Sequence, residues 1–155
     1  MTDPDRGSAT WRMGLAAMYR LIRVTDPLLR RGWRASMSSF ERTVVLRVPG
    51  RGTGRMRGTL LTLLTLDGRG YIGHPNGPAA WTRNLDAADG ADLVAADGAV
   101  TRVRGVRLGP GEERRRVIDA TASQQPFPGN VVYFLARRHI DRVGVYYRVE
   151  PVAPR

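Results

Sequence analysis

Hydrophobic and polar positions near the start of the chain recur with a helical period. At about 100° per residue, residues 10–24 place the large apolar side chains on one face, Trp11, Leu15, Met18, Leu21 and Ile22. The opposite face carries Arg12, Arg20 and Arg23, and Pro27 ends the run because proline cannot continue a helix. The pattern predicts an amphipathic helical segment over residues 1–35. It packs on the rest of the protein or on a partner subunit, or, as the alternative, lies on the inner face of a membrane.

From residue 36 onward, the apolar residues form short runs typical of β-strands. Six strands are predicted, at residues 41–49, 59–66, 71–75, 91–96, 99–108 and 144–152. The sequences "DGRG" at 67–70 and "DG" at 97–98 indicate hairpin turns, and Gly105 indicates a bulge. Because hairpins join antiparallel strands, we expect one small antiparallel barrel over residues 36–155 rather than a parallel doubly wound sheet.

Helices and a loop interrupt these strands. Residues 78–89 predict a helix with Pro78 in its first turn, and residues 109–122 predict a surface helix whose carboxylates lie at its start. Residues 123–130 predict a loop. For residues 131–140, "VVYFLARRHI", the periodicity leaves both helix and strand open. The expected fold class is therefore mainly β with helices (α+β).

Composition limits the chemistry that the chain can perform. Its 155 residues include no cysteine, which excludes disulfides and thiolate chemistry and makes a cytoplasmic location the expectation. The net charge is +11, but all 25 basic residues are arginines spread along the chain, so we expect a solvated basic surface and no nucleic-acid partner. No carboxylate pair, Ser-His-Asp set or metal-ligand cluster stands out. We therefore expect no metal, and chemistry supplied by a bound cofactor.

A loop rich in glycine and arginine follows the first predicted strand, in "VPGRGTGRMRGTLL". The backbone N–H groups from Gly52 to Gly54, the Thr53 hydroxyl and the guanidinium groups of Arg51, Arg55 and Arg57 predict a phosphate site. It is not a dinucleotide fingerprint, because an arginine stands at the third glycine position and a strand follows. The alternative is a hairpin whose arginines face water.

A second candidate stretch is "YIGHPNGPAAWTRNLDAA", residues 71–88. It contains a turn and then a helix N-terminus, where backbone N–H groups favour an anion. The residues that we expect near a cofactor here are Gly73, His74, Pro75, Asn76, Gly77, Trp81 and Asn84. The Trp81 indole either forms a wall for a planar ring or belongs to the core.

Together the two stretches resemble the deazaflavin (F420)-dependent nitroreductase family over residues 50–88. That family shows a G-R-x-[ST]-G-x-x-R loop, a T-P-L strand and a helix that reads P-x-W-x-x-N-L. The matching residues of the loop are Gly50, Arg51, Thr53, Gly54 and Arg57. Pro78 stands near the start of the helix, and Trp81, Asn84 and Leu85 match within it.

The resemblance implies a six-stranded antiparallel split β-barrel of the FMN-binding type that binds coenzyme F420. It implies hydride transfer from the reduced deazaflavin to a planar hydrophobic acceptor, a quinone, an enone or a nitroaromatic. The arginine loop would hold the phosphate and tail of the cofactor, and the turn before the tryptophan helix would contact its ring. Tyr133, near a family tyrosine on the acceptor side, would orient or protonate the acceptor.

Three departures from the family pattern are visible. Leu60 replaces the proline of T-P-L, Gly52 replaces a basic residue, and Pro75 and Asn76 stand where members often have Ser-Lys. The alternatives are FMN in place of F420, and a non-catalytic F420 or FMN carrier built on the same barrel. We expect a monomer or a homodimer.

Overall fold

The computed structural model describes residues 9–10, 12–14, 16–17, 43–124 and 129–153. The chain divides into two compact units, Met1–Phe40 and Glu41–Arg155. In the first unit, the described residues are helical, whereas the residues of the predicted apolar face and two of its arginines lie outside the description: Trp11, Leu15, Met18, Leu21, Ile22, Arg20 and Arg23. The boundary at residue 35 therefore stays a prediction.

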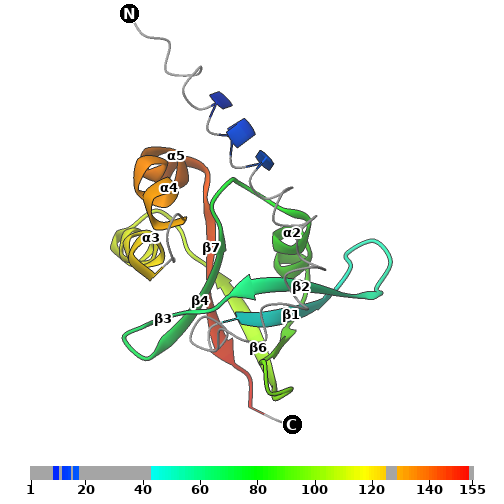
Figure 1. Ribbon diagram of the computed structural model, residues 1–155. Helices are drawn as coiled ribbons and strands as arrows, with labels where there is room; N and C mark the ends of the chain where they lie inside the picture. Colours follow the sequence, from blue (N-terminus) through cyan, green and yellow to red (C-terminus); the bar gives the residue numbers. More distant parts are fainter. Residues whose placement is uncertain (1–8, 11, 15, 18–42, 125–128, 154–155) are drawn as a thin grey trace, which may run out of the picture. The chain divides into compact units, whose positions relative to one another are not determined.

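The second unit is built around one antiparallel sheet (Figure 1). Its described strands are β1 (Thr43–Pro49), β2 (Met56–Thr62), β3 (Leu64–Leu66), β4 (Arg69–His74), β5 (Ala91–Val94), β6 (Val100–Arg107) and β7 (Val145–Pro151). The strands lie in the order β2-β1-β5-β6-β7-β4-β3, and every neighbouring pair is antiparallel. The α+β class and the antiparallel sheet are thus confirmed.

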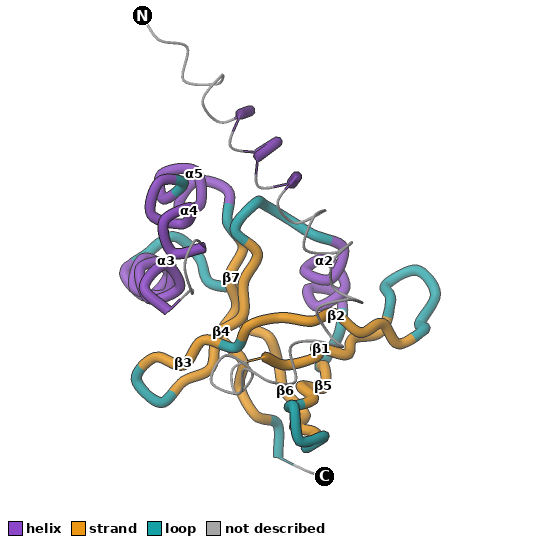
Figure 2. Tube along the Cα trace, in the orientation of Figure 1, coloured by secondary structure: helices purple, strands orange, loops and turns teal. Residues whose placement is uncertain are grey.

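The sheet has seven strands rather than the six predicted, because Leu63 divides the run at residues 59–66. The first part, β2, pairs with β1 at one edge of the sheet, and the second part, β3, pairs with β4 at the other edge. One short stretch of chain therefore joins the two edges, and the sheet must curl (Figure 2). Because sheets twist, the strands at the two edges run in different directions. The chain therefore leaves the hydrogen bonds to β1 at Leu63 before it begins those to β4.

Four helices of this unit are described, α2 (Ala80–Ala87), α3 (Glu112–Gln124), α4 (Gly129–Leu135) and α5 (Arg137–Val143). The segment that the sequence left open, residues 131–140, is helical apart from Ala136, which joins α4 to α5. Pro78 lies outside α2, because Ala79 is the N-cap and its N–H donates to the Thr82 hydroxyl at 2.9 Å. Helices α3, α4 and α5 contact one another, whereas α2 contacts β1 and β6 (Figure 2).

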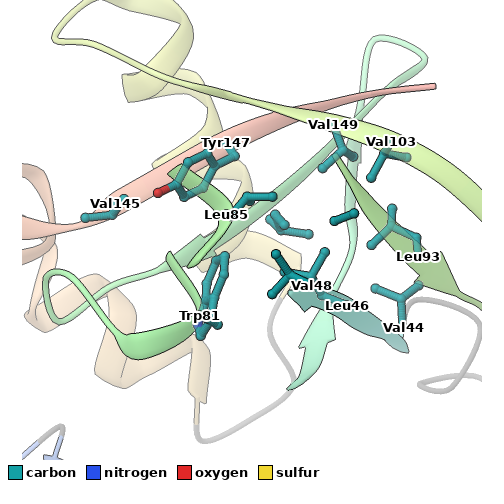
Figure 3. Packing of buried hydrophobic residues seen from close by; sticks show 12 residues of the cluster. Val44, Leu46, Val48, Trp81, Leu85, Leu93, Val103, Val145, Tyr147 and Val149 are labelled. Atoms are coloured by element: carbon teal, nitrogen blue, oxygen red, sulfur yellow. The ribbon is translucent and has the colours of Figure 1, made fainter. Parts of the chain in front are cut away.

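The core fills the inside of the curled sheet (Figure 3). Alternate residues of β1 and β5 point inward, as the twofold period of a strand requires. On β1 these are Val44, Leu46 and Val48, and α2 adds Trp81 and Leu85. The other buried residues of the cluster are Ile72, Ala91, Leu93, Val103, Val145, Tyr147 and Val149.

Gly105 does not form the predicted bulge. Its pairing with Val149 continues the regular register between β6 and β7. A Cβ atom at Gly105 would lie 2.7 Å from Cδ2 of Leu85. The glycine is therefore the contact that lets α2 press onto the sheet, which local sequence does not show.

Candidate cofactor-binding site

The glycine–arginine loop, residues 50–55, joins β1 to β2 and is closed by its own backbone. The N–H of Gly50 donates to the Arg55 carbonyl at 2.9 Å. The N–H groups of Thr53 and Gly54 donate to the Gly50 carbonyl at 3.1 Å and 2.7 Å. Those two N–H groups, predicted for a phosphate cradle, are therefore used inside the turn. Gly54 has φ 66°, a left-handed conformation that favours glycine.

The three arginines of the loop region stay exposed. Arg51, Arg55 and Arg57 form no ion pair with another residue that the structure describes. Arg57 lies over the loop, since a Cβ atom at Gly50 would lie 3.4 Å from Nε of Arg57. Three uncompensated guanidinium groups on one hairpin make an electropositive surface, and each can donate two parallel hydrogen bonds to a phosphate or carboxylate.

The turn between β4 and α2, residues 74–77, is held by both histidines of the chain. Nδ1 of His74 lies 2.8 Å from the Gly77 carbonyl, and Nε2 of His139 on α5 lies 3.0 Å from Oδ1 of Asn76. A carbonyl oxygen only accepts, so Nδ1 of His74 carries the proton. Burial lowers the pKa of His74. Gly77 has φ 87°, and Pro75 is fully buried beside it.

Helix α5, which carries His139, is itself anchored by a largely buried arginine of α3. Arg114 donates to Oδ1 of Asp141 at 3.1 Å and to the Gly144 carbonyl at 2.9 Å. It also lies 3.3 Å from the Ile140 carbonyl. A cation at the C-terminal end of a helix complements its dipole and satisfies carbonyls that have no partner in the helix. The turn is thus hydrogen-bonded to a helix that is itself held in place by α3.

One hydrogen bond joins the two predicted halves of the site. The backbone N–H of Arg51 in the loop donates to Oδ1 of Asn84 on α2 at 3.3 Å. The two residues are 33 positions apart in sequence. The structure therefore brings the loop to the helix, and the helix begins directly after the turn.

Two of the predicted cofactor residues have packing roles. Trp81 is buried in the core, where its ring centroid lies 5.9 Å from that of Tyr147. Of the two interpretations of this indole, the structure favours the core. Gly73 lies under the ring of Tyr146, since a Cβ atom there would lie 2.2 Å from Cδ1 of that ring. Trp81 and Gly73 therefore belong to the packed layer next to the site.

The predicted acid, Tyr133, lies on α4 and is only 8% exposed. Burial raises the pKa of the Tyr146 phenol, and the nearby Tyr133 phenol raises it further. The Tyr146 hydroxyl has no hydrogen-bond partner among the described residues. A buried hydroxyl without a partner costs about 1–3 kcal/mol of folding free energy, so Tyr146 destabilises this region by an amount of that order. Tyr146 and Tyr147 belong to β7 and pack there, as expected.

Neither a metal site nor a membrane span is found in the described part of the chain. No three His, Asp or Glu side chains gather there as possible metal ligands. None of the helices described is both long and apolar enough to cross a bilayer.

Comparison with known proteins gives the fold. No protein-family model and no curated protein matches the chain. Among solved structures, an F420-H2 dependent reductase, FDR-A, matches with a TM-score of 0.54 and 18% identity over 70% of this chain and 94% of that one. HutZ, a heme storage protein from Vibrio cholerae, matches with a TM-score of 0.55 and 12% identity over 74% and 84% of the two chains.

A third neighbour is a conserved hypothetical protein, Rv2991, from Mycobacterium tuberculosis. Its TM-score is 0.55 at 15% identity, over 79% of this chain and 80% of that one. At such identities the likeness establishes a shared fold and no shared activity. The fold expected from the sequence resemblance is therefore found, at the level of a curled antiparallel half-barrel with helices.

Proposed function

We propose that this protein is an F420-dependent reductase, which transfers a hydride from the reduced deazaflavin to a planar hydrophobic acceptor such as a quinone, an enone or a nitroaromatic. The observation that carries the proposal is the hydrogen bond from Arg51 to Asn84. It joins the two stretches whose motifs resemble the F420 family. The fold that the chain shares with an F420-H2 dependent reductase supports the same conclusion.

The residues of the loop region fit the charged part of this cofactor. F420 carries a phosphate and an oligoglutamate tail, and Arg51, Arg55 and Arg57 offer three exposed guanidinium groups that pair with no carboxylate of the described ranges. The Gly52 N–H takes no part in the hydrogen bonds that close the loop, so it can also face an anion. Met56 and Leu60 on β2 add exposed apolar surface directly after the loop.

Each part of the site has a distinct task. When bound, the reduced cofactor supplies the hydride. The loop binds the phosphate and tail, and the turn at residues 74–77 fixes the position of the ring through a backbone that two histidines hold. The Tyr133 phenol donates a hydrogen bond, and then a proton, to the oxygen of the acceptor. Because Tyr133 is buried, its competing role is packing, and Tyr133→Phe separates the two by removing only the hydroxyl.

The test is a fluorescence titration of the purified protein with F420 and, separately, with FMN. Three arginines exceed what the single phosphate of FMN requires, so F420 should bind more tightly. Equal or reversed affinities would remove the support for F420. Oxidation of reduced F420 in the presence of a quinone, an enone or a nitroaromatic then tests catalysis.

A non-catalytic carrier is the second candidate. One neighbour of the same fold is a heme storage protein, which supports a binding role as the alternative. Tight F420 binding with no turnover of any of the three acceptor classes would favour the carrier. A heme titration in the same series separates a heme carrier from an F420 carrier.

A further inference from the structure

The helices α4 and α5 present an outward strip formed by Val131, Phe134, Leu135, Arg138 and Arg142. Its two largest apolar side chains are 70% and 60% exposed, for Phe134 and Leu135. Phenylalanine and leucine are normally buried, and exposed apolar side chains that cluster are more informative than scattered ones. The helices that carry the strip gather with α3 at one side of the sheet (Figure 1).

The five residues are all exposed, and Ala136 joins the two helices that carry them. The Ala136 N–H donates to the Val132 carbonyl at 2.9 Å, and the Ile140 N–H donates to the Ala136 carbonyl at 2.9 Å. Within each helix, residues three or four apart lie on the same side, which groups Val131, Phe134 and Leu135 on α4 and Arg138 and Arg142 on α5. The inward side carries the buried residues Tyr133, Ala136, His139 and Ile140.

The charges on this helix pair are distributed unevenly. The residues flanking the strip are paired: Arg137 with Asp119 at 2.5 Å and Asp141 with Arg114 at 3.1 Å. Arg138 and Arg142, on the strip itself, form no ion pair with any residue in the described ranges. The strip therefore combines exposed apolar groups at one end with two uncompensated guanidinium groups at the other.

We propose that this strip docks the protein onto an anionic lipid surface. Arg138 and Arg142 would bind lipid phosphates, to which guanidinium groups donate paired hydrogen bonds. Phe134 and Leu135 would enter the boundary between headgroups and acyl chains, as the apolar faces of interfacial helices do. Val131 and Phe134 also line a hollow of about 490 Å³ beside α3, which offers room for part of an acyl chain.

Charge complementarity favours lipid over a second copy of the chain. The net charge is +11, so two copies repel each other. A symmetric contact through the strip would also bury its arginines with no carboxylate on the strip to pair with them. An anionic bilayer instead attracts each basic residue near its surface by about 1 kcal/mol.

The experiment is flotation of the full-length protein with vesicles of phosphatidylcholine, alone or mixed with phosphatidylglycerol. The wild type should float only with the mixed vesicles. The double variants Phe134→Ser/Leu135→Ser and Arg138→Gln/Arg142→Gln should each weaken partitioning about tenfold or more. Val100→Ser and Arg104→Gln change exposed residues of β6 away from the strip, and should leave partitioning unchanged. Because all these side chains are exposed, melting temperatures should not move.

Three results would overturn the proposal. One is a wild type that stays with the unbound fraction on mixed vesicles. Another is flotation that both strip variants leave intact while Arg20→Gln/Arg23→Gln removes it, which would assign lipid contact to the first unit instead. The last is a dimer in sedimentation velocity that Phe134→Ser dissociates, which would make the strip an interface between copies.

Discussion

The two halves of the candidate site are built differently. The turn at residues 74–77 is held by two side chains. Nε2 of His139 on α5 lies 3.0 Å from Oδ1 of Asn76, and Nδ1 of His74 in the turn lies 2.8 Å from the Gly77 carbonyl. The loop at residues 50–55 is closed by its own backbone and touches the rest of the site through the Arg51 N–H, at 3.3 Å from Asn84. Its charged side chains are exposed and form no ion pair within the part of the chain that the structure describes.

This difference suits two tasks: the turn can fix the position of the cofactor ring, and the loop can supply positive charge to its tail. A ring must be held in one orientation for hydride transfer, so the part of the site that contacts it gains from rigid support. An anionic tail needs favourable charge more than fixed geometry, so exposed arginines on a short hairpin suffice. Substitutions at the turn should therefore cost stability first, and substitutions of the loop arginines should cost affinity first.

The largest effect is expected at the turn side, for Gly73→Ala. The added methyl group would lie 2.2 Å from Cδ1 of Tyr146, whose ring is fully enclosed and also lies against Gly144. The ring or the strand must then move, so the free energy of unfolding should fall by about 3 kcal/mol or more. A urea titration measures it.

The matched control is Gly52→Ala, because a Cβ atom at Gly52 meets nothing within 4 Å. Its urea midpoint should stay at the wild-type value. A Gly73→Ala variant as stable as this control would show that the Tyr146 ring moves aside at little cost. The packing of β7 against β4 next to the turn would then not be rigid.

Local patterns were enough to predict the fold class. The sequence Asp67-Gly68 fixes a hairpin because both residues adopt positive φ, 51° and 73°, and the strands on either side pair at Leu66 and Arg69. The residue that divides the second strand gives no such signal. Leu63 is one leucine in an apolar run, and only the curling of the sheet selects it.

The contacts that assemble the site could not be predicted, because they join distant parts of the chain. His139 and Asn76 are 63 positions apart, and neither residue type indicates its partner. Gly105 likewise predicted a bulge. The structure instead needs a glycine there because Leu85 of α2 lies against its backbone. The glycine and arginine composition of the loop did indicate an anion site, but not that two of its N–H groups serve the turn.

The second prediction concerns charge on the loop side. Arg57→Ala should weaken F420 binding by about 1.5–3 kcal/mol, the value of a hydrogen bond to a charged group. Its side chain is exposed, so the melting temperature without cofactor should stay nearly unchanged. Fluorescence titration and a thermal melt on the same preparation measure both. A loss of stability with full affinity would assign Arg57 to the structure of the hairpin.

The third prediction weighs the backbone of the loop. Gly54 has φ 66° with no atom near its Cβ position, so Gly54→Ala tests conformation without a clash. Alanine in the left-handed region costs roughly 1–2 kcal/mol, and the unfolding free energy should fall by that amount. Gly54→Asn should lose less, since asparagine tolerates this region better. Equal losses for both substitutions would show that the side chain, not the backbone, is the cause.

The smallest expected effect is a dependence of stability on pH, which comes from the partly buried His74 of the turn. Burial lowers its pKa in the folded protein from the ordinary 6.5, so the folded state favours the neutral ring. Below about pH 6.5, the unfolded chain takes up a proton that the folded chain does not, and stability must fall as the pH falls. The contribution is fully present above that pH and is lost on the way down to the lowered pKa. His74→Gln removes the titrating group but keeps a donor for the Gly77 carbonyl. Urea midpoints between about pH 7.5 and pH 5.5 should therefore fall more steeply for the wild type than for His74→Gln. Parallel curves would mean that the ring takes up a proton as readily in the folded turn as in water.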